Sequence, residues 1–274
     1  MEQRIRESKK REALSRMKKE GIRNLCLGIA GIAGLLILWD MVARFGIIPK
    51  NLIVSPWEVV KTLAVKMRDT KPEGSLLLAH ITSSLIVALS GYALALLIGI
   101  PLGLLMGWYK AMDRLIGPVF EVLRPVPPIA WIPFTIIFLG IGLEAKAVII
   151  FLSAFIPCLI NSYSGIKLTN QVYVNVAATC GASRWEIFCR VGIPSAMPMV
   201  FAGMRISLGN AWSTLVAAEM LAANKGLGYM ILMGRTYGRV DLIMSGMVMI
   251  GILGIIFNAV FDRVERFVLR WRLE

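Results

Sequence analysis

The sequence predicts an all-α polytopic membrane protein with about six transmembrane helices. Of its 274 residues, 57% are hydrophobic and 17% are charged, and the mean hydropathy is +0.70. Soluble domains carry about 25% charged residues, so the composition argues against an ordinary cytosolic enzyme. The apolar residues also fall into long blocks, and about 20 consecutive apolar residues are what a helix needs to cross a bilayer.

Six blocks reach this length and define the expected transmembrane helices. In chain order they are 25–46, 81–108, 117–141, 146–166, 199–221 and 242–262. Prolines fall inside the third and fourth blocks, so we expect both helices to be broken. The chain then divides into a basic arm at 1–24, a first transmembrane helix at 25–46, a transmembrane core at 75–262 and a basic tail at 263–274.

The positions of Lys and Arg predict how the chain crosses the membrane. With the N-terminus inside, the cytoplasmic segments carry 20 basic residues and the outer segments carry 9. Cytoplasmic loops are enriched in Lys and Arg, so we expect both termini to be cytoplasmic. This asymmetry also explains most of the net charge of +13, which argues against nucleic acid as a partner.

The segment between the first two spans contains a recognisable helix start. Ser55 precedes Pro56 and stands three residues before Glu58, which is the pattern of a capping box with proline in the first helical turn. We expect a short helix at 56–69 outside the membrane. Within the first span, we expect Asp40 and Arg44 to form a structural ion pair.

The residues needed for catalysis are missing from this chain. It contains one histidine, His80, and four scattered cysteines, so neither a catalytic triad nor a metal site is predicted. No phosphate-binding loop of the G-x-x-x-x-G-K-[ST] type occurs, and ATP therefore cannot bind in that manner. Energy for uphill transport would have to come from an ion gradient or from another polypeptide.

Gly99, Gly103 and Gly107 recur every four residues along the second span. This spacing clears one helix face of side chains, which lets another backbone approach closely. We expect tight helix packing there, against another helix of this chain or of a second copy.

The run from Arg124 to Pro133 is difficult to accommodate as a helix that faces lipid. Its prolines remove backbone donors, and irregular backbone at membrane depth is tolerated only inside protein or along a watery cavity. One interpretation is a translocation pathway, and the other is a structural kink with an ion pair between Glu121 and Arg124. The candidate pathway residues of this run are Arg124, Pro127, Pro128 and Trp131.

A second group of candidate pathway or gate residues lies in the fifth span: Ser213, Thr214 and Glu219. An acidic side chain inside a membrane usually faces a bundle interior or water. Because Glu219 lies near the outer end of its span, a gate or a packing contact is favoured over a proton relay.

The segment 171–198, between the fourth and fifth spans, is predicted to form an ordered cytoplasmic knob. We expect a helix at 171–180 that ends at Gly181, since glycine readily takes the left-handed conformation that stops a helix. Ser183 and Glu186 have the spacing of a capping box for a second short helix. Trp185 and Phe188 are expected to be exposed, and exposed apolar side chains suggest docking into a partner.

This segment resembles the EAA loop of permease subunits of binding-protein-dependent ABC importers. The matching residues are Ala177, Gly181-Ala182-Ser183, Phe188, Val191, Ile193-Pro194, Ala196 and Pro198. Where the family motif begins with Glu-Ala, this chain has Asn175-Val176. Three further runs resemble sequences of the nitrate/sulfonate/taurine branch of that family. They are 124–133, 211–219 and Gly226-Leu227-Gly228-Tyr229.

The resemblance implies a MetI-like (type I) transmembrane domain with an additional first helix, in a bacterial plasma (inner) membrane. It implies transport of a small anion such as taurine, another aliphatic sulfonate or nitrate. The implied partners are ABC ATPase subunits, which hold the ATP and Mg²⁺, an extracytoplasmic solute-binding protein and a second copy of the chain. The residues implied to couple to the ATPase are Ala177, Gly181, Ala182, Ser183, Trp185, Phe188 and Pro194.

Two other classes of function remain as alternatives. An ion-driven secondary transporter predicts more acidic residues inside the membrane or a visible inverted repeat. A membrane scaffold without transport activity agrees with the missing catalytic residues but does not explain the broken third span.

Overall fold

The structure, a computed structural model, describes residues 23, 26–46, 49 and 52–269. These residues form helices joined by turns and loops, with no strand among them. The predicted arm at 1–24 therefore lies outside the described residues except for Arg23, as does the end of the predicted tail, 270–274. The chain divides into two units, residues 1–62 and 63–274, and each is described by itself.

The first unit contains the helix Cys26–Arg44 and the start of α2 (Pro56–Lys66). The Asp40–Arg44 ion pair is confirmed, with 2.7 Å between carboxylate and guanidinium. The capping box that begins α2 is also confirmed, since the Glu58 amide donates to Ser55 Oγ at 3.3 Å and the Ser55 amide donates to Glu58 Oε2 at 3.2 Å. The helix ends earlier than predicted.

The second unit is a bundle of long helices joined by short ones. Its elements are α3 (Leu77–Trp108), α4 (Lys110–Leu123), η1 (Pro128–Trp131), α5 (Ile132–Leu139), α6 (Leu143–Lys167), α7 (Gln171–Thr179), α8 (Arg184–Ile187), η2 (Phe188–Gly192), α9 (Ile193–Ala222), α10 (Leu227–Thr236) and α11 (Val240–Val268). Across both units, five described helices are long and apolar enough to span a membrane, or six if the bent pair of α4 and η1–α5 forms one span. The predicted fold class is confirmed.

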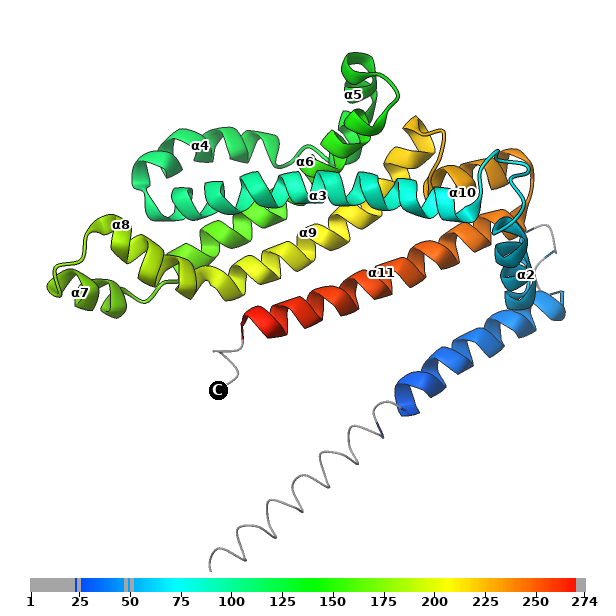
Figure 1. Cartoon of the computed structure of the whole chain (residues 1–274), viewed down its shortest axis with the longest axis horizontal. Coiled ribbons are helices and arrows are strands. Elements are labelled where there is room, and N and C mark those ends of the chain that lie inside the picture. The colour runs from blue at the N-terminus through cyan, green and yellow to red at the C-terminus, as the bar shows by residue number, and fades with distance from the viewer. Residues whose placement is uncertain (1–22, 24–25, 47–48, 50–51, 270–274) are drawn as a thin grey trace, which may run out of the picture. The chain divides into compact units, whose positions relative to one another are not determined.

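Helices α3, α6 and α9 form the centre of the bundle, with α6 in contact with both of the others (Figure 1). Side chains from all three helices build the largest hydrophobic cluster, which includes Ala95, Ile150 and Leu215. The indole of Trp212 donates a hydrogen bond of 3.1 Å to the Ile250 carbonyl, and this bond ties α9 to α11. The bundle is therefore organised around α6.

The face of α3 that carries Gly99, Gly103 and Gly107 lies directly against α6. A Cβ added to Gly103 would stand 2.5 Å from the Leu159 carbonyl oxygen, and one added to Gly107 would stand 2.8 Å from the Tyr163 carbonyl oxygen. A Cβ added to Gly99 would stand 3.3 Å from the Phe155 ring and 3.4 Å from the Cys158 side chain. These glycines thus serve helix packing within one chain.

The third and fourth predicted spans differ in how proline affects them. The third is interrupted, since α4 ends at Leu123 and the next helical residue is Pro128, with 82° between the two helical segments. The fourth was predicted to be broken as well, and this is wrong because α6 continues through Pro157. Ser207 of α9 donates to the Ala154 carbonyl at 2.7 Å and so ties α9 to this part of α6.

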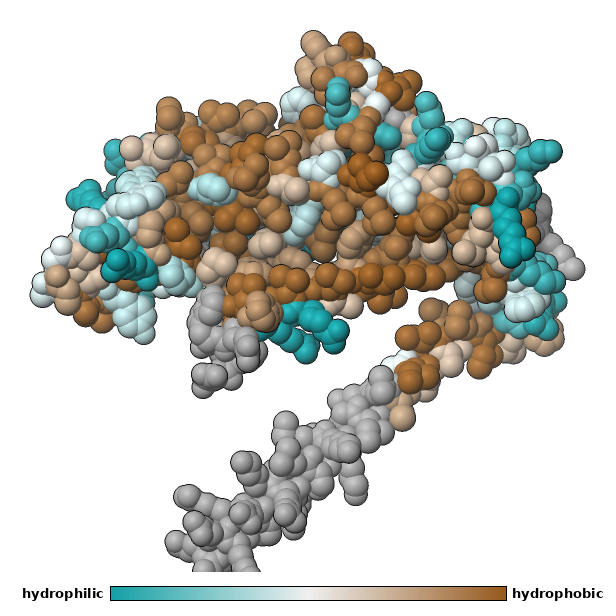
Figure 2. Space-filling model, in the orientation of Figure 1, coloured by the Kyte–Doolittle hydropathy of each residue, from teal (hydrophilic) through white to brown (hydrophobic). Residues whose placement is uncertain are grey.

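The surface polarity of the second unit matches a membrane protein. Figure 2 shows hydrophobic residues over the long helices α3 and α11, whereas hydrophilic residues gather at the end formed by α7 and α8. We refer to this end of the bundle as the α7–α8 end.

Candidate functional site

Helices α7 and α8 form the predicted knob at the end of the bundle (Figure 1). Helix α7 ends at Thr179, and Gly181 takes the left-handed conformation with φ of +83°. The capping box at the start of α8 is present, since the Glu186 amide donates to Ser183 Oγ and the Ser183 amide donates to Glu186 Oε2. The predicted local structure of the knob is thus confirmed.

The outer face of the knob carries large apolar side chains in contact with solvent. Four of them are each more than half exposed: Val172, Tyr173 and Val176 of α7, and Trp185 of α8. We call these four residues the α7–α8 apolar surface. Three of them were not among the predicted site residues, although their helical spacing (172, 173, 176) places them on one face of α7.

Phe188 does not belong to this surface, and its predicted exposure is wrong. Only 3% of it is exposed. Its ring lies 5.5 Å from that of Trp108 and 6.1 Å from that of Tyr109, at the end of α3, and 5.4 Å from that of Trp185. Phe188 therefore fastens the knob to α3 and packs against Trp185.

The other predicted coupling residues shape the knob. The Ala177 carbonyl accepts a hydrogen bond of 3.1 Å from the Ala182 amide, which closes the turn around Gly181. Pro194 lies at the start of α9, directly after the turn η2. Asn175, which replaces the glutamate of the family motif, lies exposed on α7.

One pocket lies between the α4–η1 segment and α6. Three of the four predicted pathway residues in the third span line it: Arg124, Pro128 and Trp131. Its volume is about 260 Å³. We call it the aromatic pocket; its walls include Phe120, Arg124, Pro128, Trp131, Phe151 and Phe155. Pro127, the fourth residue, is exposed and precedes η1.

A second pocket adjoins the first on the side of the α7–α8 end and shares Phe120 and Arg124 with it. It holds about 220 Å³ and is more polar, because Asp113, Glu121 and Tyr163 line it. Arg124 thus stands where the two pockets meet.

Arg124 has no ionic partner among the described residues, and the alternative ion pair with Glu121 is not formed. Arg124 itself is exposed where the two pockets adjoin.

The predicted residues of the fifth span lie elsewhere and do not form one site. Ser213 is exposed on α9. Thr214 is only 7% exposed, and its hydroxyl lies 2.7 Å from the Ser153 hydroxyl of α6. The Thr214 hydroxyl is therefore used in packing between α6 and α9, and its place on the pathway stays a prediction.

Glu219 is fully buried in a hydrogen-bonded cluster between α3, α9 and α10. Its carboxylate accepts hydrogen bonds from Ser84 Oγ at 2.7 Å and from the Gly228 amide at 2.8 Å, while Ser84 Oγ accepts from the Leu227 amide at 2.8 Å. Gly226 passes so close to the carboxylate that a Cβ there would overlap it. The sequence left two roles open for Glu219, a gate or a packing contact. This geometry is that of a packing contact.

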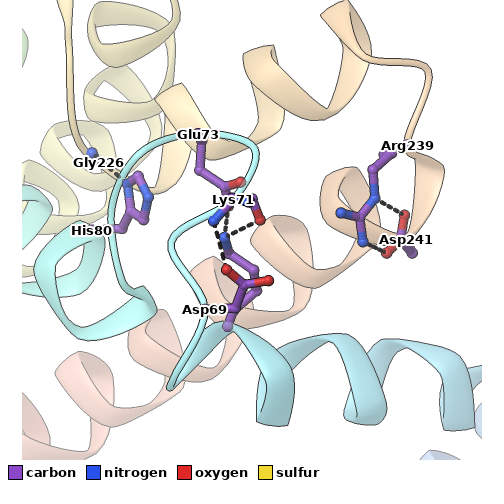
Figure 3. A network of polar contacts seen from close by, with 8 residues as sticks. Asp69, Lys71, Glu73, His80, Gly226, Arg239 and Asp241 are labelled. Carbon is purple, nitrogen blue, oxygen red and sulfur yellow. Dashed lines mark hydrogen bonds and ion pairs between the residues drawn. The ribbon is translucent and has the colours of Figure 1, made fainter.

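His80 joins this cluster to a second one at the same end of the bundle. Figure 3 shows His80 beside Gly226, whose amide donates to His80 Nδ1 at 3.1 Å. Next to it, the buried ammonium of Lys66 lies 2.8 Å from the Glu73 carboxylate and donates to the Lys71 carbonyl at 2.9 Å. These bonds fasten the α2–α3 turn.

Arg239 lies in the same region (Figure 3). Its guanidinium donates hydrogen bonds of 3.2 and 2.6 Å to Asp241, and these bonds raise the pKa of Arg239 above its usual range. Arg239 therefore remains a cation, paired with Asp241. Within the described ranges, no group of three or more His, Cys, Asp or Glu side chains is placed to hold a metal ion.

Comparison with known proteins identifies the class of this fold. The family model for the binding-protein-dependent transport system inner membrane component matches residues 99–273. A putative ABC transporter permease of Methanocaldococcus jannaschii is 35% identical over 257 residues, which cover 93% of this chain and 95% of that protein. The taurine transport system permease protein of Escherichia coli is 33% identical over 255 residues, which cover 92% of each.

A solved structure has the same fold. The inward-facing MetNI methionine ABC transporter contains a chain that superposes with a TM-score of 0.61 at 21% identity, covering 70% of this chain and 95% of that one. The fold is thus that of a MetI-like transmembrane domain. The chain belongs to the family of inner-membrane permease components of binding-protein-dependent ABC importers.

Proposed function

We propose that this chain is the transmembrane permease subunit of an ATP-driven importer for a small anionic solute. Taurine, another aliphatic sulfonate or nitrate would be delivered by an extracytoplasmic solute-binding protein. Two ATPase subunits would hold the ATP and Mg²⁺, and a second copy of the chain would complete the transmembrane part. The membership of the family and the taurine permease of E. coli as a relative support this proposal.

The α7–α8 apolar surface is the observation that carries the proposed contact with the ATPase. Large apolar side chains gathered at a hydrophilic end of the chain mark a protein-binding site. Trp185 is 58% exposed, and tryptophan is enriched among the residues that dominate binding energy at interfaces. In this proposal the α7–α8 end and both termini are cytoplasmic.

The attachment of the knob suggests how movement of the ATPase would reach the bundle. The knob is fastened to the end of α3 through Phe188, and η2 runs without interruption into α9. A displacement of α7 and α8 would therefore move α3 and α9, which are both packed on α6. ATP shifts such an equilibrium only if it binds one arrangement more tightly than the other.

Arg124 supports an anion as the solute, because it is a cation without an ionic partner among the described residues and lines two adjoining pockets. Glu219 argues against the ion-driven alternative. Its carboxylate is fully buried and already accepts hydrogen bonds from Ser84 and Gly228, so it is held in a structural role.

Replacing Trp185 with alanine tests the proposed contact. Because an exposed tryptophan at an interface contributes about 2 kcal/mol or more, we expect affinity for the ATPase subunit to fall about tenfold or more. The measurement is the amount of ATPase that co-purifies with the full chain from detergent-solubilised membranes. Val260→Ala, at an exposed position on α11, is the control, and equal co-purification of the two variants would refute the contact.

A further inference from the structure

The start of helix α2 lies beside the last turns of the first membrane helix. The indole of Trp39 donates a hydrogen bond of 2.9 Å to the carbonyl of Val54, and Val54 stands two residues before the start of α2. Trp39 lies about one and a half turns before the end of the helix Cys26–Arg44. A fully extended chain over residues 45–55 could carry α2 up to about 36 Å away, but this hydrogen bond keeps its start close to the membrane helix.

The helix Cys26–Arg44 has the length and the surface of a membrane span. Its 19 residues extend about 28 Å, which is close to the thickness of a bilayer core, about 30 Å. Only 6% of its apolar stretch is buried inside the chain, so its surface is available to lipid. The end of this helix therefore lies at a border between hydrocarbon and headgroups, and α2 begins beside that border.

Helix α2 leaves an apolar stripe uncovered. Trp57 is 60% exposed and Val60 is 53% exposed, and residues three apart share one face of a helix. Lys61 borders this stripe, with its ammonium 5.6 Å from the centre of the Trp57 ring. Tryptophan and lysine are typical of the side chains that anchor a protein at the headgroup level of a bilayer. We call Trp57 and Val60 the α2 stripe.

We propose that α2 is an interfacial helix that lies on the lipid bilayer, with the α2 stripe between headgroups and acyl chains and with the Lys61 ammonium among the phosphate groups. Helices of this kind bury their apolar face about 5–10 Å into that region. The proposal requires that the helix Cys26–Arg44 spans the membrane. The proposed function adds only the side, which is the outer leaflet, and the identity of the solute does not matter.

Continuity with the first span and charge favour lipid over a protein partner. The α2 stripe follows directly on a helix whose surface lipid covers, and the positive charge of Lys61 complements the phosphate groups of lipids. A solute-binding protein would leave after each delivery and would return Trp57 to water, whereas lipid is always present. Lipid is therefore the partner that covers this stripe permanently.

The test compares two positions of α2 that carry the same residue type with similar exposure. Val60 belongs to the α2 stripe, whereas Val65, which is 56% exposed, lies about 140° further around the helix, at about 100° per residue, on the side of Glu58. A fluorophore sensitive to its environment would be attached to Val60→Cys or to Val65→Cys. Both variants are made in a full chain that also carries Cys26→Ser, Cys180→Ser and Cys189→Ser, while Cys158 is buried and stays.

The labelled chains are co-purified with their ATPase subunits and placed in nanodiscs of phosphatidylethanolamine and phosphatidylglycerol. Part of the lipid carries a nitroxide on the acyl chain near the headgroup, and iodide is the quencher in water. We expect the fluorophore at position 60 to be quenched by the nitroxide, to be protected from iodide and to emit at shorter wavelength than the one at position 65. We expect the fluorophore at position 65 to be quenched by iodide instead.

Quenching of both positions by iodide and of neither by the nitroxide would overturn the proposal, and so would equal quenching of both by the nitroxide. Protection of position 60 that begins only when a solute-binding protein is added would assign the α2 stripe to that protein and would overturn it as well. A chain without an added cysteine should take up no label. The test of Trp185→Ala is independent of these results, so the proposed function and the interfacial helix can fail separately.

Discussion

Replacing Gly181 with valine is expected to reduce solute uptake tenfold or more while the ATPase subunits still hydrolyse ATP. Gly181 has φ of +83°, a conformation that strongly disfavours β-branched residues. An added Cβ has no neighbour within 4 Å, so the strain comes from the backbone alone. Valine would straighten the turn and separate α7 from α8, which together form the apolar surface. The measurement compares uptake and ATP hydrolysis in proteoliposomes that contain the complete complex.

Asparagine at the same position is the matched control. It tolerates the left-handed conformation better than other residues with a side chain, so Gly181→Asn should keep most of the uptake. Normal uptake by Gly181→Val in a folded complex would mean that the geometry of this turn is not needed for coupling.

Replacing Glu219 with leucine is expected to destabilise the bundle by about 3 kcal/mol or more. The change leaves Ser84 Oγ and the Gly228 amide, both buried, without their acceptor, and each buried unsatisfied group costs about 1–3 kcal/mol. The turn between α9 and α10 loses the carboxylate around which it is built. A thermal unfolding curve in detergent should shift downward by about 5 °C or more.

Two further variants separate this structural role from a role in proton transfer. Glu144→Leu removes an exposed carboxylate from the first turn of α6 and should leave the melting temperature nearly unchanged. Glu219→Gln keeps one oxygen acceptor and should retain most of the stability and the uptake. A stable Glu219→Gln variant without uptake would instead support the ion-driven alternative.

The features that the sequence predicted correctly depend on residues close together in the chain. The capping boxes of Ser55 and Ser183 and the turn at Gly181 arise within four residues. The number of spans follows from the length of each apolar block. Arg124, Pro128 and Trp131 could be grouped for the same reason, since they lie within one helical break.

The features that were missed depend on residues far apart. Phe188 is buried because α3 ends beside it, and nothing near position 188 indicates where Trp108 and Tyr109 will lie. Helix α6 continues through Pro157 inside the bundle, where α3 and α9 pack against it, and position 157 does not indicate this packing. The hydrogen bond between Ser84 and Glu219 joins residues 135 positions apart.

The aromatic pocket shows both cases. Its α4–η1 side could be predicted from the prolines and from Arg124. Its other wall consists of Phe151 and Phe155 of α6, whose spacing is typical of an ordinary hydrophobic helix. Only the packing of α6 against η1 brings the two sides together.

Photo-cross-linking from position 176 tests most directly whether the α7–α8 apolar surface receives the ATPase. A photoreactive phenylalanine analogue would replace Val176 in the full chain, with position 260 on α11 as the control, and products formed in intact membranes would be identified by mass spectrometry. We expect position 176, and not position 260, to capture a chain with a nucleotide-binding phosphate loop. Capture of an extracytoplasmic protein at position 176, or the same products at both positions, would contradict the proposed coupling.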